Sequence, residues 1–119
     1  MNVAVIGASD NPDKYSYQAV ILLKEKGHTV FPVHNKIKEI EGVKVYTSIK
    51  AIPSPIDTAS IYVSEMISNK IGDDIIEKKP RRIIFNPGAE NSMLQMRAKS
   101  KGIEALNACT LTMLRTGQF

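Results

Sequence analysis

The sequence predicts an α/β fold, a three-layer, Rossmann-like, doubly wound parallel sheet of about five strands. Apolar strand patterns and helical periodicity alternate along the whole chain, which is typical of a parallel sheet with helices on both faces. The first strand leads directly into Gly7 and a polar loop, as in nucleotide-binding α/β domains. The 119 residues are enough to bury one core, so we expect a single domain over residues 1–119.

The positions of the strands and helices follow from these patterns. Strands are predicted at residues 3–6, 29–33, 58–63, 82–85 and 103–106, with a minor strand or turn at 42–46. Helices are predicted at residues 16–26, 65–79 and 91–101, with a last short helix after residue 109. Ser16 and Ser64 are expected to cap the helices that begin at those points. Ile67, Ile71 and Ile75 recur at i, i+4 and i+8, which predicts one apolar helix face.

The loops that follow the strands are the expected place for a ligand. In an open parallel sheet, ligands bind at the carboxyl edge, near the point where the strand order reverses. The loops at this edge are predicted at residues 7–16, 34–36, 62–64, 86–88 and 107–110. Gly7 allows the backbone to pass close to a ligand, and free N–H groups at the turn and helix start favour a phosphate.

The first loop differs from the glycine-rich fingerprint of NAD-binding domains. Ala8, Ser9 and Asp10 follow Gly7, so the second and third glycines of that fingerprint are absent. The second strand ends in His34-Asn35-Lys36, without the acidic residue that holds a ribose 2′-hydroxyl. We therefore expect a phosphate-binding domain for a ligand other than NAD.

Composition argues against several other classes of protein. The net charge of +4 comes from dispersed basic residues, apart from a cluster at Lys78, Lys79, Arg81 and Arg82. This cluster is interpreted as a solvated helix end rather than a nucleic-acid interface, because cations complement a helix C-terminus. No apolar run approaches 18 residues, and the first strand starts within two residues of the N-terminus, so we expect no membrane span, no signal peptide and a cytoplasmic protein.

The few cysteine and histidine residues predict neither a metal site nor a catalytic site. The single Cys109 excludes an internal disulfide, and His28 and His34 lack metal-ligand spacing around them. His28 should begin the second strand, away from the ligand edge, and no carboxylate is identified that would orient His34. Cys109 has two interpretations, a reactive thiol near a helix N-terminus or a small buried hydrophobic residue.

Five loops together resemble a known family, the small stand-alone CoA-binding domain proteins, which are similar to the N-terminal CoA-binding domain of the succinyl-CoA synthetase α subunit. The matching segments are residues 5–12, 14–16, 27–36, 42–46, 87–88 and 107–109. The sequence departs from the family pattern in the second loop, where no proline precedes Lys36, in Asn86 of the fourth loop, and at Ala108.

The resemblance implies coenzyme A or acyl-CoA as the ligand, and it suggests roles for individual residues. Backbone N–H groups and a hydroxyl for the pyrophosphate are expected from Gly7, Ala8 and Ser9. A cation for a phosphate is expected from Lys14, and one for the phosphorylated ribose from Lys36. The full set of expected binding residues is Gly7, Ala8, Ser9, Lys14, Tyr15, Ser16, His34, Asn35, Lys36, Tyr62, Val63, Ser64, Asn86, Pro87, Gly88 and Cys109.

Within this set, residues 62–64 are expected at the adenine or the pantetheine arm, and residues 86–88 along the path of the arm. Each residue also has a purely structural interpretation, such as a tight turn, a helix cap or a solvated lysine.

The predicted function is non-enzymatic binding of CoA or acyl-CoA, by a monomer or weak homodimer with no nucleic-acid or membrane partner. Two alternatives stay open at this point. One is an NADP-linked oxidoreductase domain, because Lys36 would suit a ribose 2′-phosphate equally well. The other is an interaction protein that keeps the fold without the ligand.

Overall fold

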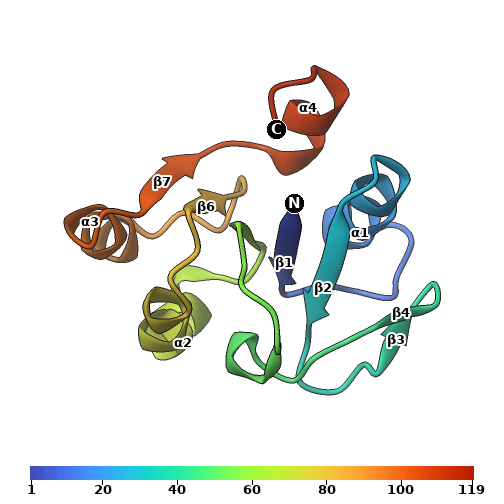
Figure 1. Cartoon of the computed structure of the whole chain (residues 1–119), viewed down its shortest axis with the longest axis horizontal. Helices are drawn as coiled ribbons and strands as arrows, with labels where there is room; N and C mark the ends of the chain where they lie inside the picture. The colour runs from blue at the N-terminus through green and yellow to red at the C-terminus, as the bar shows by residue number, and fades with distance from the viewer.

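The computed structural model describes all 119 residues and contains a five-stranded parallel sheet (Figure 1). The strands are β1 (Asn2–Ile6), β2 (Thr29–Val33), β5 (Thr58–Ile61), β6 (Arg82–Phe85) and β7 (Glu104–Asn107). They lie in the order β2-β1-β5-β6-β7, so the chain leaves β1 toward one side and later returns to its other side. This reversal confirms the predicted α/β, Rossmann-like sheet of five strands.

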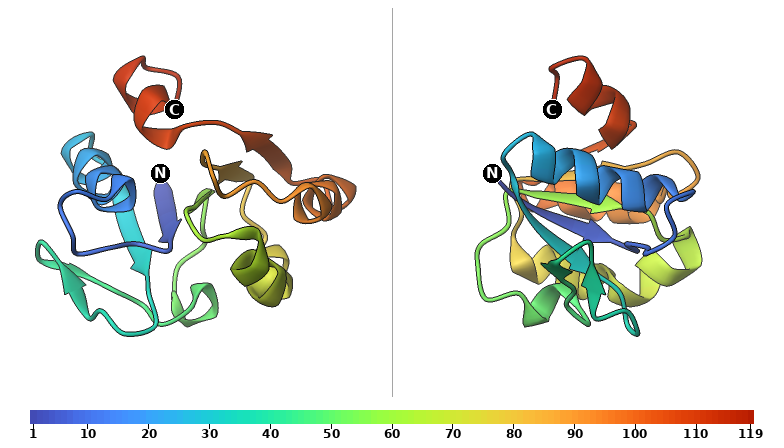
Figure 2. Two further views of the ribbon diagram at one scale, coloured as in Figure 1. Left: turned by 180° about the vertical axis from the view of Figure 1, so that it is seen from behind. Right: turned by 90° about the vertical axis from the view of Figure 1, so that its right-hand side faces the viewer.

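Helices cover both faces of the sheet, as expected for three layers. One face carries α1 (Tyr15–Glu25) and the short α4 (Thr110–Arg115). The other face carries α2 (Glu65–Lys78), α3 (Ser92–Ser100) and the 3₁₀ turn η1 (Ile49–Ala51). Figure 2 shows α1 and α4 on one side of the strands and α2 on the other. None of the helices combines the length and the apolar character needed to span a membrane.

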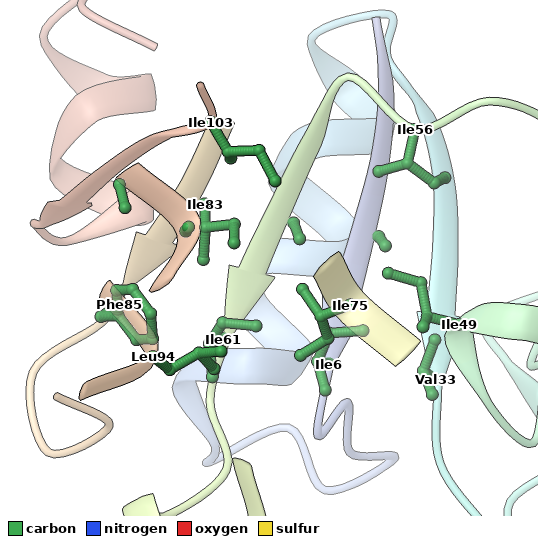
Figure 3. Close-up of a cluster of buried hydrophobic side chains, with 14 of the residues drawn as sticks. Ile6, Val33, Ile49, Ile56, Ile61, Ile75, Ile83, Phe85, Leu94 and Ile103 are labelled. Carbon is green, nitrogen blue, oxygen red and sulfur yellow. The ribbon is translucent and has the colours of Figure 1, made fainter. Parts of the chain in front are cut away.

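The first strand is buried on both faces, which explains its unbroken apolar sequence. Successive side chains of a strand point to opposite faces. Val3 and Val5 therefore pack toward α1 and α4, whereas Ala4 and Ile6 belong to the larger cluster toward α2 and α3. Figure 3 shows this larger cluster, in which Ile61, Phe85 and Leu94 lie close together.

A small antiparallel hairpin follows β2. Its strands are β3 (Glu39–Ile40) and β4 (Val43–Lys44), so the minor strand or turn expected at residues 42–46 is the second half of this hairpin. Glu41 and Gly42 form the turn with positive φ angles of 47° and 80°, as two-residue hairpin turns require.

One of the two predicted helix caps is confirmed and the other is wrong. Ser64 Oγ accepts a hydrogen bond from the N–H of Ile67 at 3.4 Å, as a capping serine should. The prediction for Ser16 is wrong, because α1 begins at Tyr15 and Ser16 is buried within its first turn. Lys14 occupies the capping position and makes no side-chain hydrogen bond there.

Candidate functional site

A cavity of about 650 Å³ lies at the carboxyl edge of the sheet, where β1 and β5 meet. Its volume is within the range of small-molecule sites. It is lined by Ile6, Gly7, Ala8, Ser9, Lys14, Tyr15, Ser16, Val33, His34, Asn35, Thr47, Ser48, Ile49, Tyr62, Val63, Ser64, Ile67, Ile71 and Asp74. The strand order places this cavity at the point of reversal, where ligands of such sheets bind.

The β1–α1 loop approaches the loop after β5 so closely that only glycine fits at position 7. Gly7 has a φ of +86°, and a Cβ atom there would lie 2.7 Å from Cγ1 of Val63. The N–H groups of Gly7 and Ala8 both donate to the carbonyl of Val33, at 3.1 and 3.2 Å. The expectation that these two N–H groups are free for a pyrophosphate is therefore wrong, because they tie the loop to β2.

The free backbone donors lie instead at Ser9 and at the start of α1. The N–H groups of Ser9, Tyr15, Ser16 and Tyr17 have no acceptor within the chain. A helix start with uncapped N–H groups attracts an anion through these donors and through the helix dipole. Lys14 stands directly before this helix start and adds a positive charge. This part of the cavity therefore has the donors that a phosphate group needs.

The loop after β2 is ordered by a histidine where the family pattern has a proline-containing turn. His34 Nδ1 accepts hydrogen bonds from the N–H groups of Lys36 at 3.0 Å and Ile37 at 3.1 Å. This arrangement leaves the proton of a neutral imidazole on Nε2. His34 and Asn35 line the cavity, whereas Lys36 is exposed on the same turn and does not form part of its wall.

The opposite wall comes from the loop after β5 and from α2. Tyr62, Val63 and Ser64 line it, as expected, together with Ile67 and Ile71. The repeat of Ile67, Ile71 and Ile75 predicted one apolar helix face, and of these three residues only Ile75 is fully buried, while Ile67 is 47% exposed. The first two isoleucines thus face the cavity, so this part of the wall was missed.

Asp74 and the segment 47–49 were also missed. No motif marked residues 47–49, which reach the cavity because η1 folds back beside β2. Figure 3 shows Ile49 next to Val33 on this side of the core.

The loops after β6 and β7 do not form part of the cavity wall. In the sheet these strands lie one and two positions beyond β5, away from the reversal. The side chain of Asn86 is buried and donates to Ser60 Oγ at 2.9 Å and to the Ile61 carbonyl at 3.0 Å, while its Oδ1 accepts from the N–H of Thr110 at 2.8 Å. Asn86 therefore joins β5, β6 and α4, and its side chain is not available to the pantetheine arm.

Pro87, Gly88 and Cys109 also lie outside the wall. Cys109 is partly exposed at the start of α4. Burial raises the pKa of its thiol, but hydrogen bonds from the Thr112 hydroxyl and from the backbone N–H groups of Thr112 and Leu111 outweigh this, and the net pKa is lowered.

His28 lies at the opposite end of the molecule from the cavity, as predicted. Its Nδ1 is 3.2 Å from the N-terminal amine of Met1, beside the amino end of β1. Partial burial, then the charges of that amine and of Arg82, lower the pKa of the imidazole.

No three His, Cys, Asp or Glu side chains come together in a way that could hold a metal ion. The cavity thus combines free N–H groups and Lys14 at the start of α1 with the apolar side chains of Ile67 and Ile71 on α2.

Relatives of this chain include proteins named as CoA ligases. A stretch of 62 residues is 47% identical to the α subunit of acetate–CoA ligase (ADP-forming) II of Pyrococcus furiosus, covering 51% of this chain and 14% of that subunit. The chain thus spans about a seventh of the length of this relative. The dinucleotide-forming acetyl-coenzyme A synthetase 1 of Candidatus Korarchaeum cryptofilum matches with a TM-score of 0.77 and 27% identity, over 89% of this chain and 25% of that one.

A second solved structure matches over nearly the full length of both chains. The crystal structure of an uncharacterized protein has a TM-score of 0.93 and 33% identity, covering 99% of this chain and 97% of that one. The family model described as "CoA binding domain" matches residues 1–115. These matches confirm the resemblance seen in the five loops, and the chain belongs to the CoA binding domain family.

Proposed function

We propose that this chain binds coenzyme A or an acyl-CoA in the cavity between β1 and β5 and does not transform it. The observation that carries the proposal is the pairing of two surfaces in one cavity. The start of α1 offers uncapped N–H groups and Lys14, whereas α2 offers the apolar side chains of Ile67 and Ile71. A ligand with phosphates at one end and an apolar part at the other fits both, and membership of the CoA binding domain family favours CoA.

The ribose phosphate of CoA has a candidate partner at the rim of the cavity. Lys36 is exposed on the turn that His34 Nδ1 holds, directly after the cavity residue Asn35. A lysine is a flexible point charge, so Lys36 can reach a phosphate from outside the wall. This placement supports the proposed contact of Lys36 with the 3′-phosphate.

The titratable side chains of the cavity support binding rather than catalysis. His34 Nδ1 already accepts two backbone N–H groups, so this nitrogen is not free to act as a base. Nucleophilic catalysis needs a nucleophile next to a base that is oriented by a third group, and the cavity brings no such set together. A cytoplasmic location and a monomeric or weakly dimeric state stay predictions from sequence.

Calorimetric titration with CoA, 3′-dephospho-CoA and NADP tests the proposal. We expect CoA to bind, and its affinity to fall tenfold or more without the 3′-phosphate, about 1.4 kcal/mol. Binding of NADP without binding of CoA would instead favour the oxidoreductase alternative. Binding of none of the three would favour an interaction protein that has the fold alone.

Two lysine variants locate the phosphate. Lys36→Ala should weaken CoA about tenfold and leave the affinity for 3′-dephospho-CoA unchanged, because only CoA has the 3′-phosphate. Lys38→Ala is the matched control, since Lys38 is an exposed lysine two residues further along the same loop and outside the cavity. Equal losses in both variants would show a general effect of charge and would contradict the contact with Lys36.

A further inference from the structure

The wall that α2 contributes to the cavity ends in a carboxylate. Ile67, Ile71 and Asp74 recur at i, i+4 and i+7, and all three line the cavity. Residues at this spacing form one stripe along a helix, and Asp74 lies about 13 Å along the axis from Glu65, where α2 begins. The stripe therefore runs from the apolar part of the cavity to a single acidic group at its far end.

This carboxylate is the wrong partner for a phosphate. An ionised Asp only accepts hydrogen bonds and repels another anion. Its ion pair with Lys50 spans 3.8 Å between side chains that are 61% and 37% exposed, so the pair is weak and leaves acceptor positions free. The cavity is thus polarised, with anion-binding donors at the start of α1 and a hydrogen-bond acceptor along α2. The same cavity therefore has room for the phosphates of a nucleotide at the start of α1 and for its base along α2, toward Asp74.

We infer that Asp74 recognises the base of the bound nucleotide by accepting a hydrogen bond from the exocyclic amine of adenine. This inference rests on the proposed binding of CoA in the same cavity. Ile49 from η1 and Ile67 and Ile71 from α2 supply the apolar surfaces that a flat ring needs. A 6-oxo purine would present an acceptor to Asp74 and be rejected.

The test compares adenosine 3′,5′-bisphosphate with inosine 3′,5′-bisphosphate by calorimetry. The wild-type chain should prefer the adenosine ligand by about ten- to a hundredfold, the usual value of a hydrogen bond to a charged group. In Asp74→Asn the preference should fall to threefold or less, on the order of 0.7 kcal/mol, because an amide offers both a donor and an acceptor. A general loss of folded protein would weaken both ligands equally and leave their ratio unchanged.

Asp73→Asn is the matched control on the same helix. Asp73 is exposed, pairs with Arg97 of α3 and does not line the cavity, so its variant should keep the wild-type preference. Two outcomes would overturn the recognition of adenine by Asp74. In the first, the wild-type chain binds CoA but binds both bisphosphates equally. In the second, Asp74→Asn weakens the affinity for CoA but for neither bisphosphate. Absence of CoA binding by the wild-type chain would overturn the proposed function itself.

Discussion

Tyr62 has a buried side-chain oxygen, Oη, that has no hydrogen-bond partner. The residue follows β5 and lines the cavity, while its ring also packs against the core cluster beneath α1 and α4. Burial, and after it the negative charge of an ionised Cys109, raises the pKa of the phenol to about 12. Tyr62 is therefore a neutral hydroxyl in the wall of the cavity, and the fold resists its ionisation.

This raised pKa predicts a loss of stability in alkali. An unfolded tyrosine ionises near pH 10, before the folded one does, so the stabilisation is complete below pH 10 and is lost as the pH rises toward 12. The free energy of unfolding should fall by about 1.4 kcal/mol between pH 9 and 11 on account of this group alone. Urea unfolding of the wild type and of Tyr62→Phe measures this fall. Lysines also titrate in this pH range, but they do so in both proteins, so the difference between the two free energies of unfolding reports Tyr62 alone.

Below pH 10, Tyr62→Phe should be as stable as the wild type or more stable, because it removes a buried hydroxyl without a partner. Parallel pH dependences of the two proteins would contradict the assignment of the raised pKa to Tyr62.

Single residues of the cavity could be predicted where local sequence decides their place. Gly7 and the polar residues after it follow a buried strand, and that pattern is enough to put them at the carboxyl edge. The hydrogen bonds of Gly7 and Ala8 could not be predicted, because their acceptor is the carbonyl of Val33, which is distant in the sequence and meets them only across β1 and β2. The N–H donors for a phosphate were consequently expected in the turn at residues 7 and 8. In the structure those N–H groups are bonded, and the N–H groups without an acceptor are at the start of α1.

At the scale of elements, α1 differs from α2 and α3 in having no capping side chain. Ser64 caps α2, and Asn91 caps α3 by accepting from the N–H of Leu94 at 3.0 Å. In α1 the capping position holds Lys14, which cannot accept a hydrogen bond. The first N–H groups of α1 are therefore left without a side-chain acceptor beside the cavity, where the proposed function places the phosphates.

The variant Lys14→Ser should therefore stabilise the protein and weaken its binding of CoA. A serine at the capping position contributes about 0.5–2 kcal/mol, because its oxygen satisfies an N–H group of the first turn. The same change removes the cation and occupies a donor that the phosphate needs, so the affinity should fall about tenfold or more. Urea unfolding and calorimetric titration on one sample measure both effects.

The control for net charge is Lys99→Ser, at an exposed position on α3 far from the cavity. It should change neither the affinity nor the stability beyond about 0.5 kcal/mol. A loss of stability in Lys14→Ser together with unchanged affinity would contradict the proposed role of this helix start.

Periodicity located the helices well but assigned their faces less well. The repeat of isoleucines in α2 predicted the helix, yet apolar residues at helical spacing look the same whether they face a core or a ligand cavity. Ile67 and Ile71 line the cavity whereas Ile75 is buried, and this difference depends on where η1 lies beside α2. No local pattern in the sequence predicts the position of η1. Helix starts are similarly ambiguous, because Ser16 is a good capping residue that lies two positions beyond Lys14, which occupies the capping position.

At the scale of the whole molecule, the strand order decides which loops meet. Alternating strands and helices predict a parallel sheet, but they do not say which strand neighbours which. All five loops at the carboxyl edge were therefore equal candidates for the site. The order β2-β1-β5-β6-β7 brings together the loops after β1, β2 and β5, and leaves those after β6 and β7 outside the cavity wall.

This separation of the loops predicts which backbone amide signals change when CoA is added. Titration followed by backbone amide NMR should shift the signals of Ser9 and of Tyr15, Ser16 and Tyr17 most, because in the proposed complex their free N–H groups donate to the phosphates. The amide of Gly88, which donates to Glu90 at 3.0 Å, should change little. At a CoA concentration a hundred times the dissociation constant, the free energy of unfolding should rise by about 2.7 kcal/mol.

Large shifts at residues 86–88 would instead show that the pantetheine arm crosses the loop after β6, as the sequence alone predicted. Shifts confined to that loop, with none at the start of α1, would contradict the placement of the phosphates. The two regions are separated by β5 and by the buried network of Asn86, so a ligand bound only between β1 and β5 has no direct contact through which to perturb both. The pattern of shifts therefore distinguishes a ligand held at the reversal of the sheet from one laid across its whole carboxyl edge.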